Sequence, residues 1–251
     1  MTPSPLPHPR RRRHRHGAST GVERLRRHYA QSPVATAAVL LVLLAVVRIA
    51  GAFHPALMVA SIAITPMVVI AVPPSQYRQV GLCRVSSPKA LLAGLVAVLL
   101  SYAASVGACV LLFGTGPDNW ARGMRTIFDT AVADDATGRR AMLGIYVLIC
   151  LGILIPAAEE VCYRGVLHTA AASRLGSGAA VVATSIAWAV VHLGDYGLQP
   201  VNARVIVGVL PSIFLMGLAL GWSRVITRSV VSATLGQGIA NVVLAVWVLH
   251  W

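Results

Sequence analysis

The segment PAAEEVCYRG, residues 156–165, holds two adjacent glutamates, Glu159 and Glu160, in the most apolar half of a chain with one other glutamate, Glu23. The chain has 251 residues, of which 57% are hydrophobic and 12% are charged, and its mean hydropathy is +0.74. This composition lies far outside the range of a soluble domain. An ionisable group at membrane depth is costly unless it is paired or lines a wet cavity. Both glutamates are therefore candidate functional residues.

Long apolar stretches recur from residue 34 to the end of the chain. Each is long enough, or nearly so, to cross about 30 Å of hydrocarbon. Backbone groups in lipid need internal partners, and the alternating pattern of a barrel is missing, so the stretches should be helices. They cover residues 34–53, 55–74, 90–113, 142–158 (which can be extended), 178–193, 205–222 and 229–249. The predicted fold is all-α, a polytopic transmembrane helical bundle of about seven spans.

The positions of the charged residues predict the units of the chain and its orientation in the membrane. Arginines crowd residues 1–33, which we expect to form a basic, disordered cytoplasmic tail. More cations lie on the same side of the predicted spans, in loop 75–89 and at Arg174 and Arg228. The N-terminus is therefore expected in the cytoplasm, and the protein in the cell membrane. The remaining predicted units are three transmembrane helices in residues 34–113, an extracytoplasmic loop in residues 114–141 with a short interfacial helix around residues 120–132, and a transmembrane core in residues 142–251, which holds the two glutamates.

The run RRRRHRH, residues 10–16, is the densest cationic cluster in the sequence. Such a run can indicate nucleic-acid binding. Beside a first membrane span, however, it is more simply a topogenic signal or a segment that rests on anionic lipid. We therefore expect the lipid bilayer as a partner and no nucleic acid.

Glu160 and Arg164 are four residues apart, with the acid first, which is the favourable order for an ion pair on a helix. Glu159 lies about 100° around the same helix. It has no obvious local partner and is available for chemistry. The alternative is that both acids serve Arg164 and only hold helices together.

His192 should lie at the depth of the glutamates. A turn is expected at Gly176, and equal lengths of chain separate Gly176 from Glu160 and from His192. Because a helix rises by a constant amount per residue, the hairpin brings both residues to one level. One turn apart in the last span, Gln237 and Asn241 present two amide donors to one point, although amides in membranes are also common interhelical contacts.

Three motifs carry a family resemblance: E-E-x-x-x-R at residues 159–164, WAVVH at residues 188–192, and GLALGWSRVITRSVVSATLGQGIAN at residues 217–241. Together they resemble the CAAX prenyl endopeptidases and bacteriocin-processing enzymes (CPBP or Abi), which are multi-span intramembrane endopeptidases. The similarity covers roughly residues 140–245. It implies a CAAX-protease-like core in which Glu159 and His192 activate a water and polar residues of the last motif stabilise the oxyanion. By this reading the donors are Gln237 and Asn241, and the supporting residues are Glu160, Arg164 and Trp188.

Two positions depart from the family pattern. Trp188 replaces the usual Phe, which is a mild change, and Gln237 replaces the usual His. An amide is a poor zinc ligand, whereas it can donate a hydrogen bond to an oxyanion. The sequence thus favours amide hydrolysis without a metal cofactor, with Glu159 as the base and His192 orienting the water and passing a proton to the leaving amine. The alternatives are a divalent metal such as zinc held by Glu159 and His192, or lost activity.

Other classes of function are open at the level of sequence. A non-catalytic membrane scaffold, or an immunity or regulatory protein, would keep the fold and tolerate Gln237. A transporter needs a continuous polar path, but the polar groups cluster at one level only. If the chain is an enzyme, the expected substrate is a membrane-associated protein or peptide.

Overall fold

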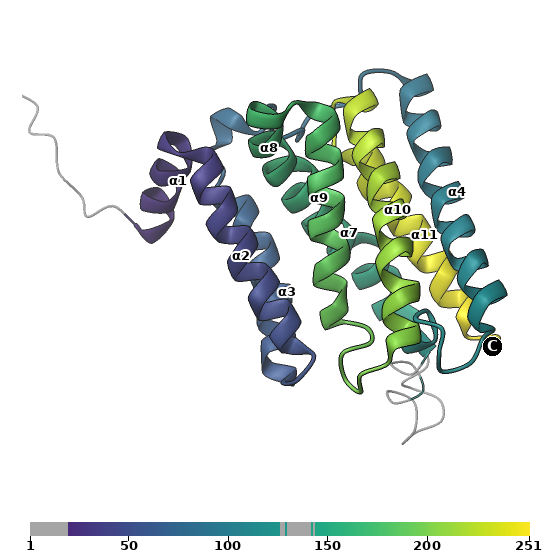
Figure 1. The fold of residues 1–251 in the computed structure, drawn as a ribbon. Coiled ribbons are helices and arrows are strands. Elements are labelled where there is room, and N and C mark those ends of the chain that lie inside the picture. Colours follow the sequence, from purple (N-terminus) through teal and green to yellow (C-terminus); the bar gives the residue numbers. More distant parts are fainter. Residues whose placement is uncertain (1–19, 126–128, 130–141, 143) are drawn as a thin grey trace, which may run out of the picture.

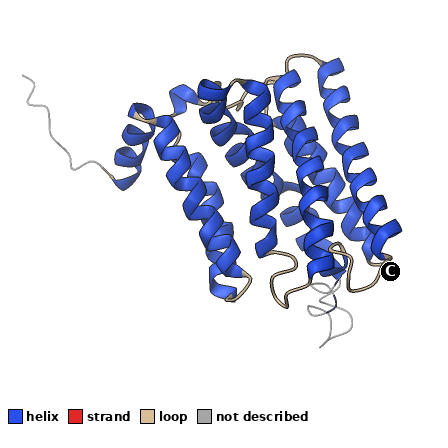
Figure 2. Ribbon diagram, in the orientation of Figure 1, coloured by secondary structure: helices blue, strands red, loops and turns tan. Residues whose placement is uncertain are grey.

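The computed structural model describes residues 20–125, 129, 142 and 144–251, and the described residues are mainly helical (Figure 1). Figure 2 shows no strand in these ranges, where the β-pairing is limited to one isolated bridge between Leu198 and Val201. The all-α prediction is therefore confirmed. The longer helices are α1 (Gly21–Gln31), α2 (Pro33–Gly51), α3 (Pro55–Ala71), α4 (Pro88–Phe113), α8 (His168–Leu175), α9 (Ser177–Val191), α10 (Ala203–Thr227) and α11 (Val231–Val248).

Six helical segments of the described chain are long and apolar enough to cross a membrane. They are Pro33–Gly51, Pro88–Phe113, Gly144–Leu175, Ser177–Gly194, Ala203–Thr227 and Val231–Val248. The remaining predicted stretch is α3, whose 17 residues lie at the short end of what a span needs. Apolar side chains cover the outer faces, for example Leu111, which is 88% exposed. Such a surface is suited to lipid, so the chain is a multi-pass membrane protein.

Helix α1 corrects the prediction of a disordered tail up to residue 33. Its first turn is closed by a capping box, in which Thr20 Oγ1 accepts from the Glu23 backbone N–H and Glu23 Oε2 accepts from the Thr20 N–H, at 3.3 and 3.0 Å. The reciprocal cap satisfies backbone donors that a helix otherwise leaves free. Tyr29 of this helix is buried. The RRRRHRH run lies outside the described residues.

The fourth span is longer than the predicted residues 142–158 and changes helix type along its length. The π-helical segments η2 (Val147–Leu154) and η3 (Val161–Leu167) flank a short α-helix, α7 (Ile155–Glu160). π-Helical turns occur often at functional sites because they displace side chains from the regular α-helical register. The two glutamates are in α7, between the two irregular segments.

Helix α10 packs against α4, α9 and α11, and the α2–α3 hairpin lies at the edge of the bundle (Figure 1). Glycines allow the closest approaches. A Cβ on Gly217 would come within 3.1 Å of the Ser185 Cα on α9, and one on Gly238 would meet the Gly152 carbonyl oxygen of η2. Gly217 therefore allows close packing of α10 against α9. The predicted turn at Gly176 is also present, with a φ of +80° that favours glycine.

The loop between α4 and the fourth span is described in part. Trp120 and Ala121 are buried and residues 122–125 are helical, at the place where an interfacial helix is predicted. The rest of that predicted helix lies outside the described residues, apart from position 129. Trp120 contacts the Tyr196 ring at 5.4 Å, which joins this loop to the one after α9.

Candidate active site

Glu159 lies at the centre of a buried polar cluster. Its Oε1 accepts a hydrogen bond from Arg48 Nη1 at 2.6 Å, and its Oε2 accepts from Gln237 Nε2 at 2.8 Å and from Trp188 Nε1 at 3.2 Å. The donors come from α2, α11 and α9. The expectation that Glu159 lacks a partner is correct for its own helix and wrong for the folded chain. Distant segments supply all three donors.

Arg48 is the residue of this cluster that the sequence motifs missed. Its guanidinium forms ion pairs with Glu159 and with Asp195, both at 2.6 Å, and Nη2 lies 3.5 Å from Nε2 of His192. Arg48 is in α2, and Asp195 follows η4 (His192–Gly194) at the end of α9. A cation inside an apolar span is itself a signal for a buried acidic partner. The sequence, however, does not say which acid that partner is.

His192 is buried beside Trp188, with ring centroids 4.6 Å apart and the planes nearly perpendicular. Its Nδ1 lies 2.6 Å from the Trp188 carbonyl oxygen. Because a carbonyl oxygen can only accept, Nδ1 carries the hydrogen. In the neutral ring, Nε2 is then an acceptor, and it faces the guanidinium of Arg48 and the neighbourhood of Glu159. The predicted meeting of His192 with the glutamate region is confirmed.

Glu160 and Arg164 form the predicted ion pair. Arg164 Nη1 donates to Glu160 Oε1 at 2.7 Å, and both side chains are 0% exposed. Arg164 also donates to the Gly217 carbonyl at 3.3 Å and lies 4.5 Å from the centroid of the Trp188 ring. Since Glu159 pairs with Arg48 instead, the alternative that both acids serve Arg164 is wrong.

Gln237 and Asn241 do not direct their amides to one acceptor, which corrects the expectation from their spacing. Gln237 donates to Glu159, whereas Asn241 Nδ2 donates to the Leu151 carbonyl of η2 at 3.2 Å. The π-helical turn brings that carbonyl to the face of α11 where Asn241 lies. Gln237 Oε1 is buried with no hydrogen-bond partner among the described residues. It is an acceptor beside the Glu159 carboxylate.

The residues at this centre do not fit the alternative of a zinc site. The described residues contain no group of three His, Cys, Asp or Glu side chains placed to hold a metal ion. Glu159, Asp195 and His192 instead converge on Arg48, whose guanidinium supplies the positive charge between them. The fourth neighbour, Gln237, is an amide and a weak zinc ligand.

The loop that carries Asp195 is fixed at its far end by Asp118. Asn202 Nδ2 and Arg204 Nη1 donate to the Asp118 carboxylate at 3.1 and 2.9 Å. These hydrogen bonds, first from Asn202 and then from Arg204, hold the pKa of Asp118 below its usual value. Asp195 remains 23% exposed, so the loop side of the cluster is open to solvent.

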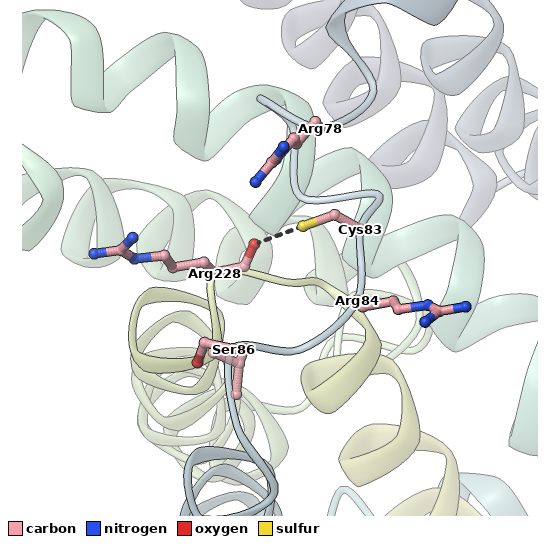
Figure 3. Close-up of a pocket in the computed structure, with 6 residues that line it drawn as sticks. Arg78, Cys83, Arg84, Ser86 and Arg228 are labelled. Carbon is pink, nitrogen blue, oxygen red and sulfur yellow. Dashed lines mark hydrogen bonds between the residues drawn. The ribbon is translucent and has the colours of Figure 1, made fainter.

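A second polar feature lies at the other end of α10. A pocket of about 330 Å³ is lined by Arg78, Cys83, Arg84, Ser86, Thr227 and Arg228 (Figure 3). Cys83 donates to the Arg228 carbonyl at 3.2 Å, and Arg84 points away from Arg78 and Arg228. No carboxylate or imidazole lines this pocket. It lacks the groups for acid–base chemistry and is separate from the Glu159 cluster.

The fold and the cluster define a class: a helical, multi-pass membrane protein with a carboxylate, an imidazole and an amide gathered inside the bundle. Residues 141–243 match the family model described as Rce1-like, type II CAAX prenyl endopeptidase. The match confirms the resemblance that the motifs indicated: residues 141–243 are similar to that family. Comparison with curated proteins and with solved structures gave no match.

Proposed function

We propose that the protein is an intramembrane endopeptidase that hydrolyses peptide bonds of a membrane-associated protein or peptide. The observation that carries the proposal is that Glu159 and His192 lie around one guanidinium, that of Arg48, at a buried centre. A carboxylate offers about four acceptor positions, and three of those on Glu159 are filled. The one that remains is on Oε1. Nε2 of His192 is an acceptor that faces Arg48 Nη2 at 3.5 Å, and the attacking water would replace this long contact.

In the proposed reaction, a water between Glu159 and His192 attacks the carbonyl carbon of the substrate peptide bond. One proton of the water passes to Glu159 as the new C–O bond forms. Nε2 of His192 accepts a hydrogen bond from the same water and orients it. Glu159 then returns its proton to the amide nitrogen as the C–N bond breaks, which releases a carboxylic acid and an amine. This assigns the return of the proton to Glu159 rather than to His192, because the hydrogen of the neutral ring is on Nδ1.

The amides supply the proposed stabilisation of the oxyanion. Gln237 and Asn241 each use one N–H in the hydrogen bonds described above and retain a second one. A donor aimed at a developing oxyanion contributes about 10² to 10³ in rate in comparable sites. The free Oε1 of Gln237 can accept from the N–H of the substrate amide. Glu160 and Arg164 support the site by fixing α7 against α10.

The proposed setting is the cell membrane, with the N-terminus in the cytoplasm. The arginines near the N-terminus and around the pocket of Figure 3 support this orientation by the positive-inside rule. His192 and Asp195 are at the opposite end of α9 from the Gly176 turn. The water and the substrate would then reach the cluster from the side of the loop that carries Asp195.

A non-catalytic scaffold or regulatory protein is the second candidate. It is favoured by the engagement of Glu159 with three donors, which is also what a purely structural buried carboxylate requires. Such a protein would keep the same ion pairs and bind a partner without cleaving it.

The deciding experiment is a cleavage assay with purified protein in lipid nanodiscs. A library of membrane-anchored peptides is incubated with wild type, Glu159→Gln, His192→Ala and the matched control Glu23→Gln. We expect cleavage by wild type and Glu23→Gln, and a loss of at least about 10³-fold in the other two, because the base and the orienting acceptor are removed. Thermal unfolding of each variant checks that the fold is retained. Activity within threefold of wild type in Glu159→Gln or His192→Ala contradicts the assigned roles, and no cleavage by wild type favours the scaffold.

A further inference from the structure

We propose that Arg48 is a positioning residue of the active site, so that α2, which lies outside the family-matching residues 141–243, completes the catalytic centre. This inference rests on the proposed function. It concerns how Glu159 is held in the geometry and charge state that the reaction needs.

The contacts of Arg48 are directed and use both sides of its guanidinium. Nη1 donates to Glu159, whereas Nε at 3.3 Å and Nη2 at 2.6 Å donate to the two oxygens of Asp195. The two-point contact with Asp195 fixes the plane of the guanidinium. Nη1 is thereby aimed at Oε1 of Glu159, the oxygen that retains the open acceptor position. Asp195 therefore orients Arg48, and Arg48 orients the base.

The charges around Glu159 also indicate that Arg48 keeps this carboxylate in the state that the reaction needs. Glu159 and Asp195 are two carboxylates that face one another across a single cation, and the Arg48 and Glu159 side chains are only 14% and 4% exposed. Within the described residues, Glu159 forms its ion pair with Arg48. The nearby Arg164 forms its ion pair with Glu160 instead. A carboxylate that loses its neighbouring cation keeps its proton to higher pH. A protonated Glu159 could not accept a proton from water.

Backbone packing independently places Arg48 at the site. Gly194 of η4 lies against α2 so closely that a Cβ there would meet the Arg48 carbonyl oxygen and come within 3.0 Å of the Ile49 Cα. Only a residue without a side chain allows this approach. The chain thus brings α2 to the end of α9 at Arg48 itself.

The test compares Arg48→Gln and Arg48→Lys with wild type in the cleavage assay, with Arg125→Gln as the matched control. Arg125 also pairs with an aspartate, Asp129, at 3.1 Å, but it lies outside the cluster and outside the loop that carries Asp195. We expect Arg48→Gln to lower kcat by about 10²-fold, the cost of a misplaced catalytic group, with KM within threefold. The acid limb of the pH–rate profile should move to higher pH. Arg48→Lys should restore part of the rate and shift the limb less, because it keeps the charge and loses the fork.

A second variant allows the test to be completed if Arg48→Gln does not fold. Arg48→Gln combined with Asp195→Asn has the same net charge as wild type and is expected to fold where the single variant does not. It should show the same loss of kcat and the same shift of the acid limb. Wild-type rates and an unchanged pH profile in a folded Arg48→Gln or double variant would overturn the inference and leave the proposed function intact. If wild type itself cleaves nothing, the proposed function fails, and the role of Arg48 fails with it.

Discussion

Trp188 and Gln237 are the two residues that depart from the usual family motifs, and both donate to the same atom, Oε2 of Glu159. A phenylalanine in place of Trp188 could pack against His192 and Arg164 but could not donate. The two departures therefore act on one oxygen, and the tryptophan is more than the mild change that the sequence suggested. With Arg48 on Oε1, they give the carboxylate three donors from three helices.

Trp188→Phe tests the indole donor. The variant keeps an aromatic ring beside Arg164 and His192 and removes one N–H. A hydrogen bond to a charged group is worth about 1.5 to 3 kcal/mol, so we expect kcat to fall by about tenfold or more with little change in Tm. Trp222→Phe, on the exposed face of α10, is the control. Equal kcat in both variants would show that the indole N–H is unimportant for the reaction.

Gln237 separates the three readings of the site. If it acts through its N–H groups, Gln237→His keeps or raises activity, Gln237→Ala lowers it by about 10² or more, and chelators have no effect. A metal enzyme gives the reverse: zinc bound by Gln237→His and inhibition by EDTA. A scaffold cleaves in none of these forms. The assay is run with metal analysis of each purified protein, and stoichiometric zinc in wild type would falsify the metal-free mechanism.

At the scale of the element, α7 and the two π-helical segments form one irregular helix that turns adjacent glutamates to different partners. Glu159 meets α2, α9 and α11, whereas Glu160 pairs with Arg164 along the same helix. Arg164 in turn reaches the Gly217 carbonyl of α10. The second acid thus holds the helix in place while the first is presented to the site.

Arg164→Ala tests this division of roles. The substitution leaves Glu160 buried without its cation, which costs about 3 to 5 kcal/mol when a buried pair is broken. We expect a large fall in thermal stability in detergent together with a loss of activity. Arg164→Met with Glu160→Gln should recover much of the stability, because no unpaired charge remains. Arg204→Ala, at an exposed pair, is the control, and an Arg164→Ala protein with the Tm of wild type would contradict the pairing.

At the scale of the whole molecule, the two ends of the bundle differ in character. One end carries α1 and the turn between α8 and α9, whereas the other carries the loops that follow α4 and α9 and the C-terminus (Figure 1). The first of these loops contains Asp118 and the second contains Asp195, and the arginine-lined pocket lies where α10 ends, next to Thr227. The polar cluster around Glu159 is connected to the second end through Asp195. Cations at the first end are what a cytoplasmic surface requires.

Reporter fusions test this orientation. A fluorescent reporter at the N-terminus should be cytoplasmic, and alkaline phosphatase fused after Trp251 should be active outside the cytoplasm, because about seven helices separate the two ends. Replacing the arginines of residues 10–15 by glutamine should weaken the preference. Both reporters on the same side of the membrane would mean that one apolar helix, with α3 as the first suspect, does not cross it.

The sequence by itself determined the helical, membrane-spanning class, the Glu160–Arg164 pair and the approach of His192 to the glutamates. These features depend on local quantities: the length of apolar runs, four-residue spacing and the constant rise of a helix. The sequence could not assign Arg48 and Asp195 to Glu159, because that contact depends on how α2 rotates and packs against the end of α9. The prediction that Gln237 and Asn241 direct their amides to one point was wrong for a related reason. Asn241 donates to the Leu151 carbonyl of a π-helical segment, and no local sequence pattern predicts that segment.

Only the tertiary structure decided which cation neutralises the candidate base. In an apolar interior, each buried charge must find a partner, and several arginines in this chain could have served. The choice was made by close backbone contact at Gly194, which admits α2, and by the loop that holds Asp195 beside it. Those are packing distances between segments far apart in the chain, and periodicity along a single helix carries no information about them.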